Sequence, residues 1–300
     1  MILSTDYDAT DPSLLHVGGD YLLYTTGGGF GNNPHVVVHV GPTIGKWTST
    51  HEALPRLPAW TSENVWAPAV QQVQGGWALY FTGTVTGSDP SIQCIGAAFG
   101  AKPTGPFVAG PSPIICQTDH RGSIDPRTYV DPQGSLWLDW KSDDNADPNT
   151  PGPDQGGLTG IYAQRLSANG RQLLGQPSEI FQPDESWEGT IVESPQMIDV
   201  AGSYYLFFSA NWFNQPDYGI GVASCASVTG PCHSIGSQPF LGSNYQGSGP
   251  GEPSVYVSSG GVYLLYTPVH AAAPAITPPR PVAMARVGFS DNVPYLAAFS

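Results

Sequence analysis

The chain has 300 residues, with 10 Lys and Arg against 24 Asp and Glu, so its formal net charge is −14. Such a chain lacks the basic face needed to bind nucleic acid or an anionic membrane surface, and we expect a neutral partner. Its 37 Gly and 30 Pro disfavour long helices, while an aromatic content of 11% argues against disorder, which leaves a folded, turn-rich, β-dominated protein.

One pattern occurs five times along the chain. Each copy has a small or acidic residue, a proline, an apolar strand, a Gly-containing turn and an aromatic strand. Apolar residues alternate with a period of two on both sides of the turn, which predicts a β-hairpin. The predicted hairpins span residues 11–27, 67–83, 125–142, 194–210 and 252–268.

A second hairpin follows the first in each copy, as in residues 157–175, where Asn169-Gly170 is the expected turn. Four strands per copy, repeated five times, predict an all-β protein that folds as a five-bladed β-propeller with four antiparallel strands per blade. No domain boundary is visible, so we expect one propeller domain over residues 1–300. Residues 142–157 form an insert that we interpret as a surface loop.

Four cysteines suit two disulfides and hence an oxidising compartment. Cys225 and Cys232 lie close enough to bridge one turn, which leaves Cys94 and Cys116 to pair by elimination, although four cysteines allow three pairings. No signal peptide is recognisable, so we expect a mature secreted chain to which Met1 was added. No apolar run approaches the roughly 20 residues that span a bilayer.

Carboxylates are concentrated at one position of the repeat. Asp11, Asp125 and Glu252 directly precede the prolines of their copies, and Glu193 lies one residue earlier. Equivalent positions of successive blades surround the central axis, so these groups should converge. Like charges at short range raise one another's pKa values, as glycoside hydrolysis requires for its acid. The alternative is structural, because Asp-Pro often opens a turn by capping backbone amides.

The motifs around these carboxylates resemble those of glycoside hydrolase family 43, the five-bladed enzymes that act on arabinans, arabinoxylans and xylans. The resemblance covers nearly the whole length. A connector at residues 103–107, Pro-Thr-Gly-Pro-Phe, is also similar to a turn of that family. The motifs that carry it are Asp11-Pro12-Ser13, Trp66-Ala67-Pro68, Ile124-Asp125-Pro126 and Glu193-Ser194-Pro195.

The resemblance implies a role for each of three carboxylates. Asp11 becomes the general base that activates water, Glu193 the general acid, and Asp125 the group that orients Glu193 and tunes its pKa. The family inverts the anomeric configuration, which requires room for a water molecule between base and sugar. Glu188 is a rival for the acid, but Glu193 is preferred because it occupies the repeat position.

Two residues depart from the family pattern. Ala69 stands where many relatives have Asp, and Glu252 stands where the family often has a His that helps to hold a calcium ion or a water cluster in the channel. Glu252 could attract a cation, share a proton with the catalytic acids or contact substrate. No cofactor is expected to be required, and a structural calcium ion in the channel stays open.

Further candidates contact substrate in our interpretation. Trp66 is expected to stack on a sugar ring, and Trp187, Trp212 and Phe213 to build the rim of the cleft, with core packing or loop anchoring as the alternative. Arg280 aligns with a substrate-contacting arginine of the family, and Arg286 is the other possibility. The insert contains Asp143, Asn145, Asp147 and Asp154 at some calcium-loop spacings, but Pro148 occupies the position where such a loop needs Gly, which argues against calcium.

The leading hypothesis is an inverting glycosidase acting on arabinose-containing polysaccharide, an α-arabinofuranosidase or an arabinanase. The second is a propeller that binds glycans without cleaving them, motivated by Ala69 and Glu252. A third places the chain among xylosidases, galactofuranosidases or fructan-cleaving relatives, although Ile124 stands where the last group has Arg. We expect a secreted monomer that acts on a neutral oligo- or polysaccharide; exo or endo action stays open.

Overall fold

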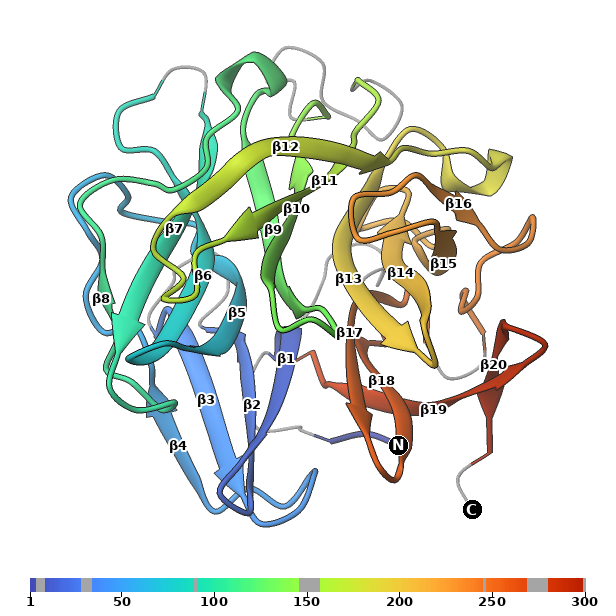
Figure 1. Ribbon diagram of the computed structural model, residues 1–300, viewed down its shortest axis with the longest axis horizontal. Helices are drawn as coiled ribbons and strands as arrows, with labels where there is room; N and C mark the ends of the chain where they lie inside the picture. Colours follow the sequence, from blue (N-terminus) through green and yellow to red (C-terminus); the bar gives the residue numbers. More distant parts are fainter. Residues whose placement is uncertain are drawn as a thin grey trace.

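The computed structural model describes residues 1–3, 9–27, 34–88, 91–145, 157–244, 247–268 and 280–298. In these ranges the chain forms five antiparallel sheets of four strands each, and each sheet takes its strands in sequence order. The sheets follow one another around a common centre, with the first strand of each sheet innermost (Figure 1). The predicted five-bladed β-propeller is therefore confirmed.

The strand bounds follow the repeat. The first two blades contain β1 (Thr10–Val17), β2 (Asp20–Thr26), β3 (Val36–Gly41), β4 (Ser49–Glu52), β5 (Trp66–Val73), β6 (Gly76–Thr84), β7 (Gln93–Gly100) and β8 (Val108–Ala109). The third contains β9 (Ser123–Val130), β10 (Leu136–Ser142), β11 (Ile161–Leu166) and β12 (Leu173–Phe181). The last two contain β13 (Val192–Val200), β14 (Ser203–Ala210), β15 (Gly219–Cys225), β16 (Cys232–Ser234), β17 (Gly251–Ser258), β18 (Gly261–Thr267), β19 (Ala283–Ser290) and β20 (Val293–Ala297).

The residue before each repeat proline has an unusual backbone conformation. Its φ angle lies between +51° and +57° in all five blades, which is the left-handed region that residues other than Gly rarely adopt. The pairing of the inner strand shifts register at the same point, so that the strand bends there. We call these five the pivot residues: Asp11, Ala67, Asp125, Ser194 and Glu252.

The pivot residues are joined in a ring. The backbone N–H of each donates a hydrogen bond to a side-chain oxygen of the preceding blade. The acceptors for Asp11, Ala67, Asp125, Ser194 and Glu252 are Glu252 Oε2 at 2.7 Å, Thr26 Oγ1 at 3.1 Å, Thr82 Oγ1 at 3.1 Å, Asp125 Oδ2 at 3.0 Å and Ser209 Oγ at 2.9 Å. These bonds fix the relative position of all five inner strands at one end of the channel.

The core lies between blades rather than at a single centre. Five apolar clusters are formed, and each occupies the seam between two neighbouring blades. Tyr80, Tyr205 and Phe207 are among the largest side chains that these seams bury completely or nearly so. Burying one such ring stabilises the fold by about 1.5–3 kcal/mol, so every seam contributes several such increments.

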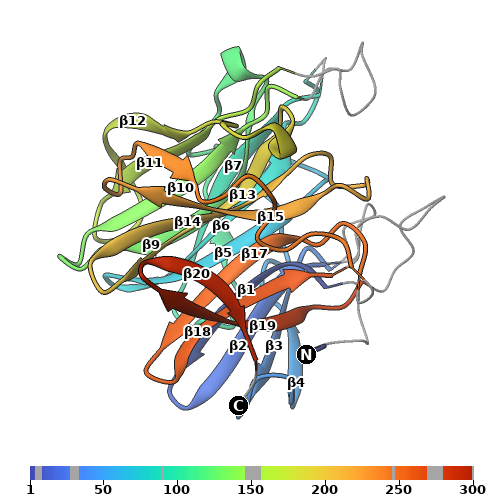
Figure 2. The ribbon, with the colours of Figure 1, turned by 90° about the vertical axis from the view of Figure 1, so that its right-hand side faces the viewer.

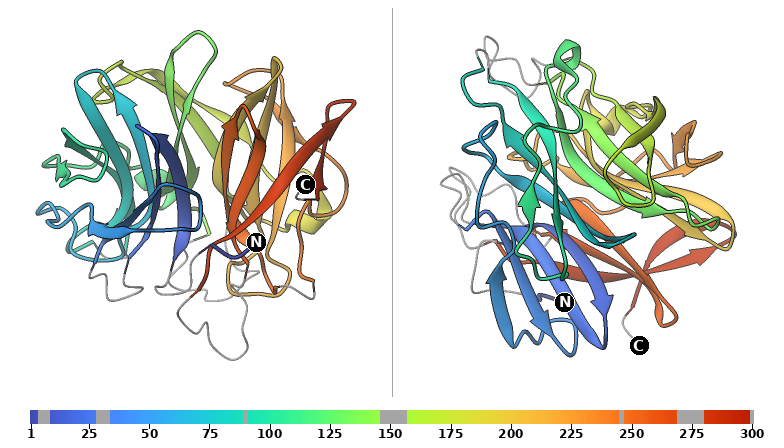
Figure 3. Two further views of the ribbon diagram at one scale, coloured as in Figure 1. Left: turned by 90° about the horizontal axis from the view of Figure 1, so that it is seen from below. Right: turned by 60° about the vertical axis from the view of Figure 1, so that its left-hand side comes forward.

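The ends of the sequence close the ring of blades. The backbone N–H of Leu3 donates to the carbonyl of Val282 at 2.7 Å, and the amino group of Met1 donates to the carbonyl of Met284. The N-terminal segment therefore lies against the edge of β19 in the fifth blade, as all the ribbon views show (Figures 2 and 3). This contact ties the start of the first blade to the last.

Both predicted disulfides are present. Cys94 in β7 is bonded to Cys116 in the segment after β8, and Cys225 in β15 is bonded to its strand partner Cys232 in β16. The described residues also include the short 3₁₀ helices η2 (Thr118–His120) and η3 (Ser186–Glu188), and none of the helices in these ranges has the length and apolar character to cross a membrane.

Candidate active site

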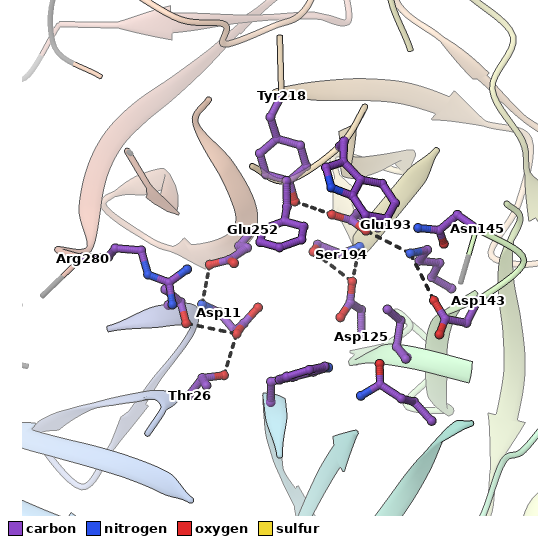
Figure 4. Close-up of a pocket in the computed structure, with 17 residues that line it drawn as sticks. Asp11, Thr26, Asp125, Asp143, Asn145, Glu193, Ser194, Tyr218, Glu252 and Arg280 are labelled. Atoms are coloured by element: carbon purple, nitrogen blue, oxygen red, sulfur yellow. Dashed lines mark hydrogen bonds and ion pairs between the residues drawn. The ribbon is translucent and has the colours of Figure 1, made fainter. Parts of the chain in front are cut away.

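A pocket of about 260 Å³ opens at the end of the channel where the inner strands begin. Four of the five pivot residues line this pocket, and Ala67 does not. The four carboxylates of the repeat position, Asp11, Asp125, Glu193 and Glu252, all line the pocket. Figure 4 shows Asp11 and Glu252 on one side of it and Glu193 on the other.

Asp11 is buried, with 9% of its surface exposed. The hydroxyl of Thr26 donates a hydrogen bond of 2.5 Å to its Oδ2, and its own N–H is held by Glu252. Burial and then the negative charge of Glu252 raise the pKa of Asp11 to about 6, although Thr26, Arg127 and Arg280 oppose the rise. Asp11 is therefore a carboxylate at neutral pH that still accepts a proton readily.

Glu193 is held at both carboxyl oxygens. Tyr218 donates its hydroxyl to Oε1 at 2.6 Å, and the ammonium of Lys141 donates to Oε2 at 3.0 Å. Lys141 is almost wholly buried, and its Nζ also lies 3.6 Å from Oδ1 of Asp143. Burial disfavours the ammonium, but the surrounding carboxylates outweigh it and raise the pKa of Lys141. A fixed cation therefore stands beside Glu193.

Asp125 lies next to Glu193. Its Oδ2 accepts hydrogen bonds from both the N–H and the hydroxyl of Ser194, at 3.0 and 3.1 Å. Burial and then the charge of Glu193 raise the pKa of Asp125 to about 8, with Lys141 acting against the rise. Asp125 therefore stays protonated at neutral pH, whereas Asp11 does not.

Glu252 contacts Asp11 directly. Its Oε2 accepts the N–H of Asp11 and the hydroxyl of Thr267, both at 2.7 Å. The guanidinium of Arg127 is buried in the same region and donates to the carbonyl of Pro68 at 3.0 Å. Burial lowers the pKa of Arg127, while the charges of Asp11, Asp125 and Glu252 act against that effect.

Nothing in the described ranges supports a metal site: they contain no group of three or more His, Cys, Asp or Glu side chains that could hold an ion. The start of the acidic insert does not form the expected surface loop, because Asp143 is buried beside Lys141 and Asn145 lines the pocket. Asp147, Pro148 and Asp154 lie outside the described residues.

The aromatic candidates divide into two groups. Trp66, Trp212 and Phe213 line the pocket, as does Arg280. Trp187 does not; its ring stacks on Phe208 at 6.1 Å between centroids and packs on the apolar cluster between the third and fourth blades. This position does not support the expected contact of Trp187 with substrate, because core packing occupies the ring.

Three other candidates also lie outside the pocket. Glu188 is completely buried, and its carboxylate accepts hydrogen bonds from the N–H groups of Asp184 and Glu185. These bonds cap a short helix, so the carboxylate has a structural role there. Arg286 is not among the residues that line the pocket. Ala69 packs in the apolar cluster between the second and third blades, so its methyl group does not face the pocket.

Two residues in contact with Glu193 were missed in the sequence. Lys141 occupies the position of β10 that pairs with the residue before the pivot, and the four other blades have a hydroxyl there. A comparison of the second strands across the repeat would have found this exception. The hydroxyl residues at this position of the four other blades are Thr26, Thr82, Ser209 and Thr267. The second missed residue, Tyr218, lies just before β15, where the repeat offers no signal.

Comparison with known proteins agrees with this geometry. The model of the family described as glycosyl hydrolases family 43 matches residues 2–294. Among solved structures, a thermostable family-43 glycoside hydrolase superposes with a TM-score of 0.83 at 25% identity, covering 98% of this chain and 94% of that one.

Three curated relatives have different named activities. An extracellular endo-α-(1→5)-L-arabinanase of Thermotoga petrophila is 26% identical over 74% of this chain and 50% of its own length. An extracellular exo-α-(1→5)-L-arabinofuranosidase of Streptomyces avermitilis is 27% identical over 69% of this chain and 44% of its own length. A β-D-galactofuranosidase of Aspergillus niger is 25% identical over 85% of this chain and 72% of its own length. The chain thus spans half or less of the length of the first two.

Proposed function

The chain belongs to the glycosyl hydrolases of family 43, and from this membership we propose that it is an inverting glycoside hydrolase acting on arabinose-containing polysaccharide, an α-arabinofuranosidase or an arabinanase. The single observation that carries the proposal is the pocket in which Asp11 and Glu193 face each other from opposite sides. Two carboxyl groups on opposite sides of a sugar are what inversion by a single displacement requires.

In the proposed reaction, Asp11 removes a proton from a water molecule as the water oxygen bonds to the anomeric carbon. The bond between that carbon and the glycosidic oxygen breaks, and Glu193 gives its proton to the departing oxygen. The sugar leaves with inverted configuration, Asp11 holds the proton of the water, and exchange with solvent restores both groups. The ionised state of Asp11 at neutral pH supports its role as the base in this scheme.

Asp125 supports Glu193 in this scheme without touching the departing oxygen. Burial and then the charge of Glu193 raise the pKa of Asp125 to about 8, so the two neighbouring carboxyls influence each other's protonation. The two hydrogen bonds from Ser194 fix its Oδ2. We therefore assign Asp125 the role of orienting Glu193 and tuning its pKa.

A neutral sugar polymer suits the pocket as substrate. Trp66, Trp212 and Phe213 offer aromatic faces, and Arg280 offers hydrogen-bond donors to hydroxyl groups. The relatives named for arabinan and arabinofuranoside favour arabinose-containing chains. Two disulfides and the extracellular relatives support secretion, and we propose that the protein acts as a monomer.

The test is product analysis on arabinan, arabinoxylan, xylan and galactan, with proton NMR of the first product to assign its anomeric configuration. We expect arabinose or arabino-oligosaccharides of inverted configuration from the wild type, and polysaccharide cleavage slowed by about 10³-fold in D11N and E193Q. Retention of configuration, or equal rates in both variants and the wild type, would contradict the proposal. Sugar binding without turnover would instead support the non-catalytic alternative.

A second activity, cleavage of β-galactofuranosides, is favoured by one observation. The relative named for it matches 85% of this chain and is itself covered over 72% of its length, more than the two arabinan-directed relatives are. Including a 4-nitrophenyl β-galactofuranoside beside the α-arabinofuranoside separates the two activities by their ratio of kcat/KM.

A further inference from the structure

We propose that Glu252 is a positioning residue for Asp11, which holds the backbone of Asp11 in place and puts a negative charge beside its carboxyl group. The inference deepens the proposed function and rests on it only in naming Asp11 as the base.

The geometry joins the two residues across the seam between the fifth and first blades. Glu252 Oε2 accepts the N–H of Asp11 at 2.7 Å, and the same oxygen accepts the hydroxyl of Thr267. The N–H of Glu252 is in turn bound to Ser209 Oγ in the fourth blade at 2.9 Å. Glu252 is thus fixed at both its backbone and its side chain, and it holds Asp11 at the backbone.

Comparison around the ring shows that the carboxylate is not needed to join the blades. In the first, second and fourth blades, a second-strand hydroxyl accepts the N–H of the next pivot residue directly. Thr267 occupies the equivalent position in the fifth blade, yet it donates to Glu252, and Glu252 takes over the bond to Asp11. The fifth blade therefore places a carboxylate where a neutral hydroxyl serves in the first, second and fourth blades.

That charge acts on a buried group. Asp11 and Glu252 are each 9% exposed, so solvent screens their repulsion poorly. The charged groups that face Asp11 are Glu252 from β17, Arg127 and Asp125 from β9, and Arg280 before β19; Thr26 adds a hydrogen bond from β2. Burial is the largest cause of the raised pKa of Asp11 and Glu252 the second, while both arginines and Thr26 oppose them.

The variant E252Q separates charge from hydrogen bonding, because the amide oxygen of Gln can accept both bonds that Glu252 accepts. We would label the full chain with ¹³C at the aspartate side-chain carboxyls and follow their NMR signals with pH, identifying Asp11 by its loss in D11N. The titration midpoint of the Asp11 carboxyl should fall by roughly one pH unit in E252Q. It should stay above the ordinary value for Asp, because Asp11 is still buried. An unchanged or higher midpoint would overturn the inference.

Two further variants sharpen the result. E63Q is the matched control, since it removes the same charge from an exposed glutamate, and it should leave the midpoint where it is. E252D keeps the charge but shortens the side chain, so the midpoint should stay raised while kcat falls about tenfold through loss of the positioning bond. A midpoint that fell equally in E252D and E252Q would indicate a structural role only.

The wild-type protein provides a test that does not depend on the folding of a variant. When Asp11 and Glu252 interact, the Asp11 signal must respond to pH in two steps, one of them at the midpoint of Glu252. Independent single-step titrations would overturn the inference. Neither the variant titrations nor the wild-type titration needs substrate. If Asp11 and Glu252 titrate as a coupled pair but the protein cleaves no glycan, the proposed function is contradicted and this inference is not. Cleavage with uncoupled carboxyls would contradict this inference alone.

Discussion

The Nζ atom of Lys141 lies 3.0 Å from Oε2 of Glu193, so a buried ammonium of the third blade reaches across the seam to a carboxylate of the fourth. Lys141 has 1% of its side chain exposed and Glu193 has 12%. The equivalent position in the four other blades has a hydroxyl that bonds across or along its seam. In the third blade the N–H of Ser194 is accepted by Asp125 and not by the second-strand residue. Lys141 is therefore able to bind Glu193 instead.

We predict that K141M impairs both stability and activity. Removing the ammonium leaves Glu193 and Asp143 buried without a counter-charge, and the free energy of unfolding should fall by about 3 kcal/mol. Loss of the contact that fixes Glu193 should lower kcat about 100-fold with little change in KM. Urea denaturation and steady-state kinetics measure the two effects. K141R should recover part of both, and a K141M enzyme with wild-type kcat would contradict the placement of Glu193 as the acid.

The acid and the base should respond differently to the leaving group. A leaving group of low pKa departs without protonation, so E193Q should lose about 10³-fold in kcat on arabino-oligosaccharides and much less on a 4-nitrophenyl arabinofuranoside. D11N should be impaired on both, since each reaction needs an activated water. Parallel kinetics on the two substrates decide the point. If E193Q were equally impaired on both, Glu193 would not be the proton donor.

The activity should rise with pH through about 6. Asp11 must be ionised to accept a proton from water, and its raised pKa of about 6 means that the protonated form dominates below that value. The value of kcat/KM should therefore fall tenfold for each pH unit below about 5. A profile measured from pH 4 to pH 9 tests this, with circular dichroism to confirm that the fold persists. A rate independent of pH between 4 and 7 would contradict the assignment of Asp11.

The repeat made most of the fold predictable. A proline near the start of each inner strand and a Gly turn within each hairpin recur in all five blades. Their spacing alone predicted the hairpins and the convergence of the four carboxylates Asp11, Asp125, Glu193 and Glu252. Features that break the repeat were harder to predict. Tyr218 reaches Glu193 from an irregular segment 25 residues further along the chain, and no periodicity places such a residue.

Aromatic residues in loops present the same difficulty. Trp187 and Trp212 each stand near the end of a strand, and nothing in the local sequence distinguishes a ring that packs from one that lines a pocket. The structure separates them by their neighbours, because Trp187 meets Phe208 of the core and Trp212 meets Phe213 at the pocket. Such a distinction depends on tertiary packing between blades, which a single sequence does not reveal.

The two tryptophans should therefore differ when each is replaced by alanine. W212A removes an aromatic face from the pocket and should raise KM about tenfold, with the unfolding free energy nearly unchanged. W187A leaves a cavity beside Phe208 and should lower the unfolding free energy by about 2–3 kcal/mol, with KM unchanged. Kinetics and urea denaturation on both proteins provide the comparison. A rise in KM for W187A would return that residue to the substrate site.

Stability should decrease as pH rises because of Asp139, a carboxyl group in β10 that is not among the residues lining the pocket. It is completely buried, and neither oxygen has a hydrogen bond of ordinary geometry to a described residue. Burial raises the pKa of Asp139 to about 8, and the backbone N–H of Met197 offsets only part of the rise. In the unfolded chain its pKa returns to about 3.9.

The folded state therefore retains a proton that the unfolded state loses between pH 4 and pH 8. The contribution of this group to stability is complete below about pH 4 and is lost as the pH rises toward 8. D139N is neutral at every pH, and its stability relative to the wild type should grow by about 4 kcal/mol between pH 5 and pH 8. Urea denaturation at pH 5 and pH 8 measures the gain, with E63Q as an exposed control. A gain equal at the two pH values would mean that Asp139 is ionised in the folded protein.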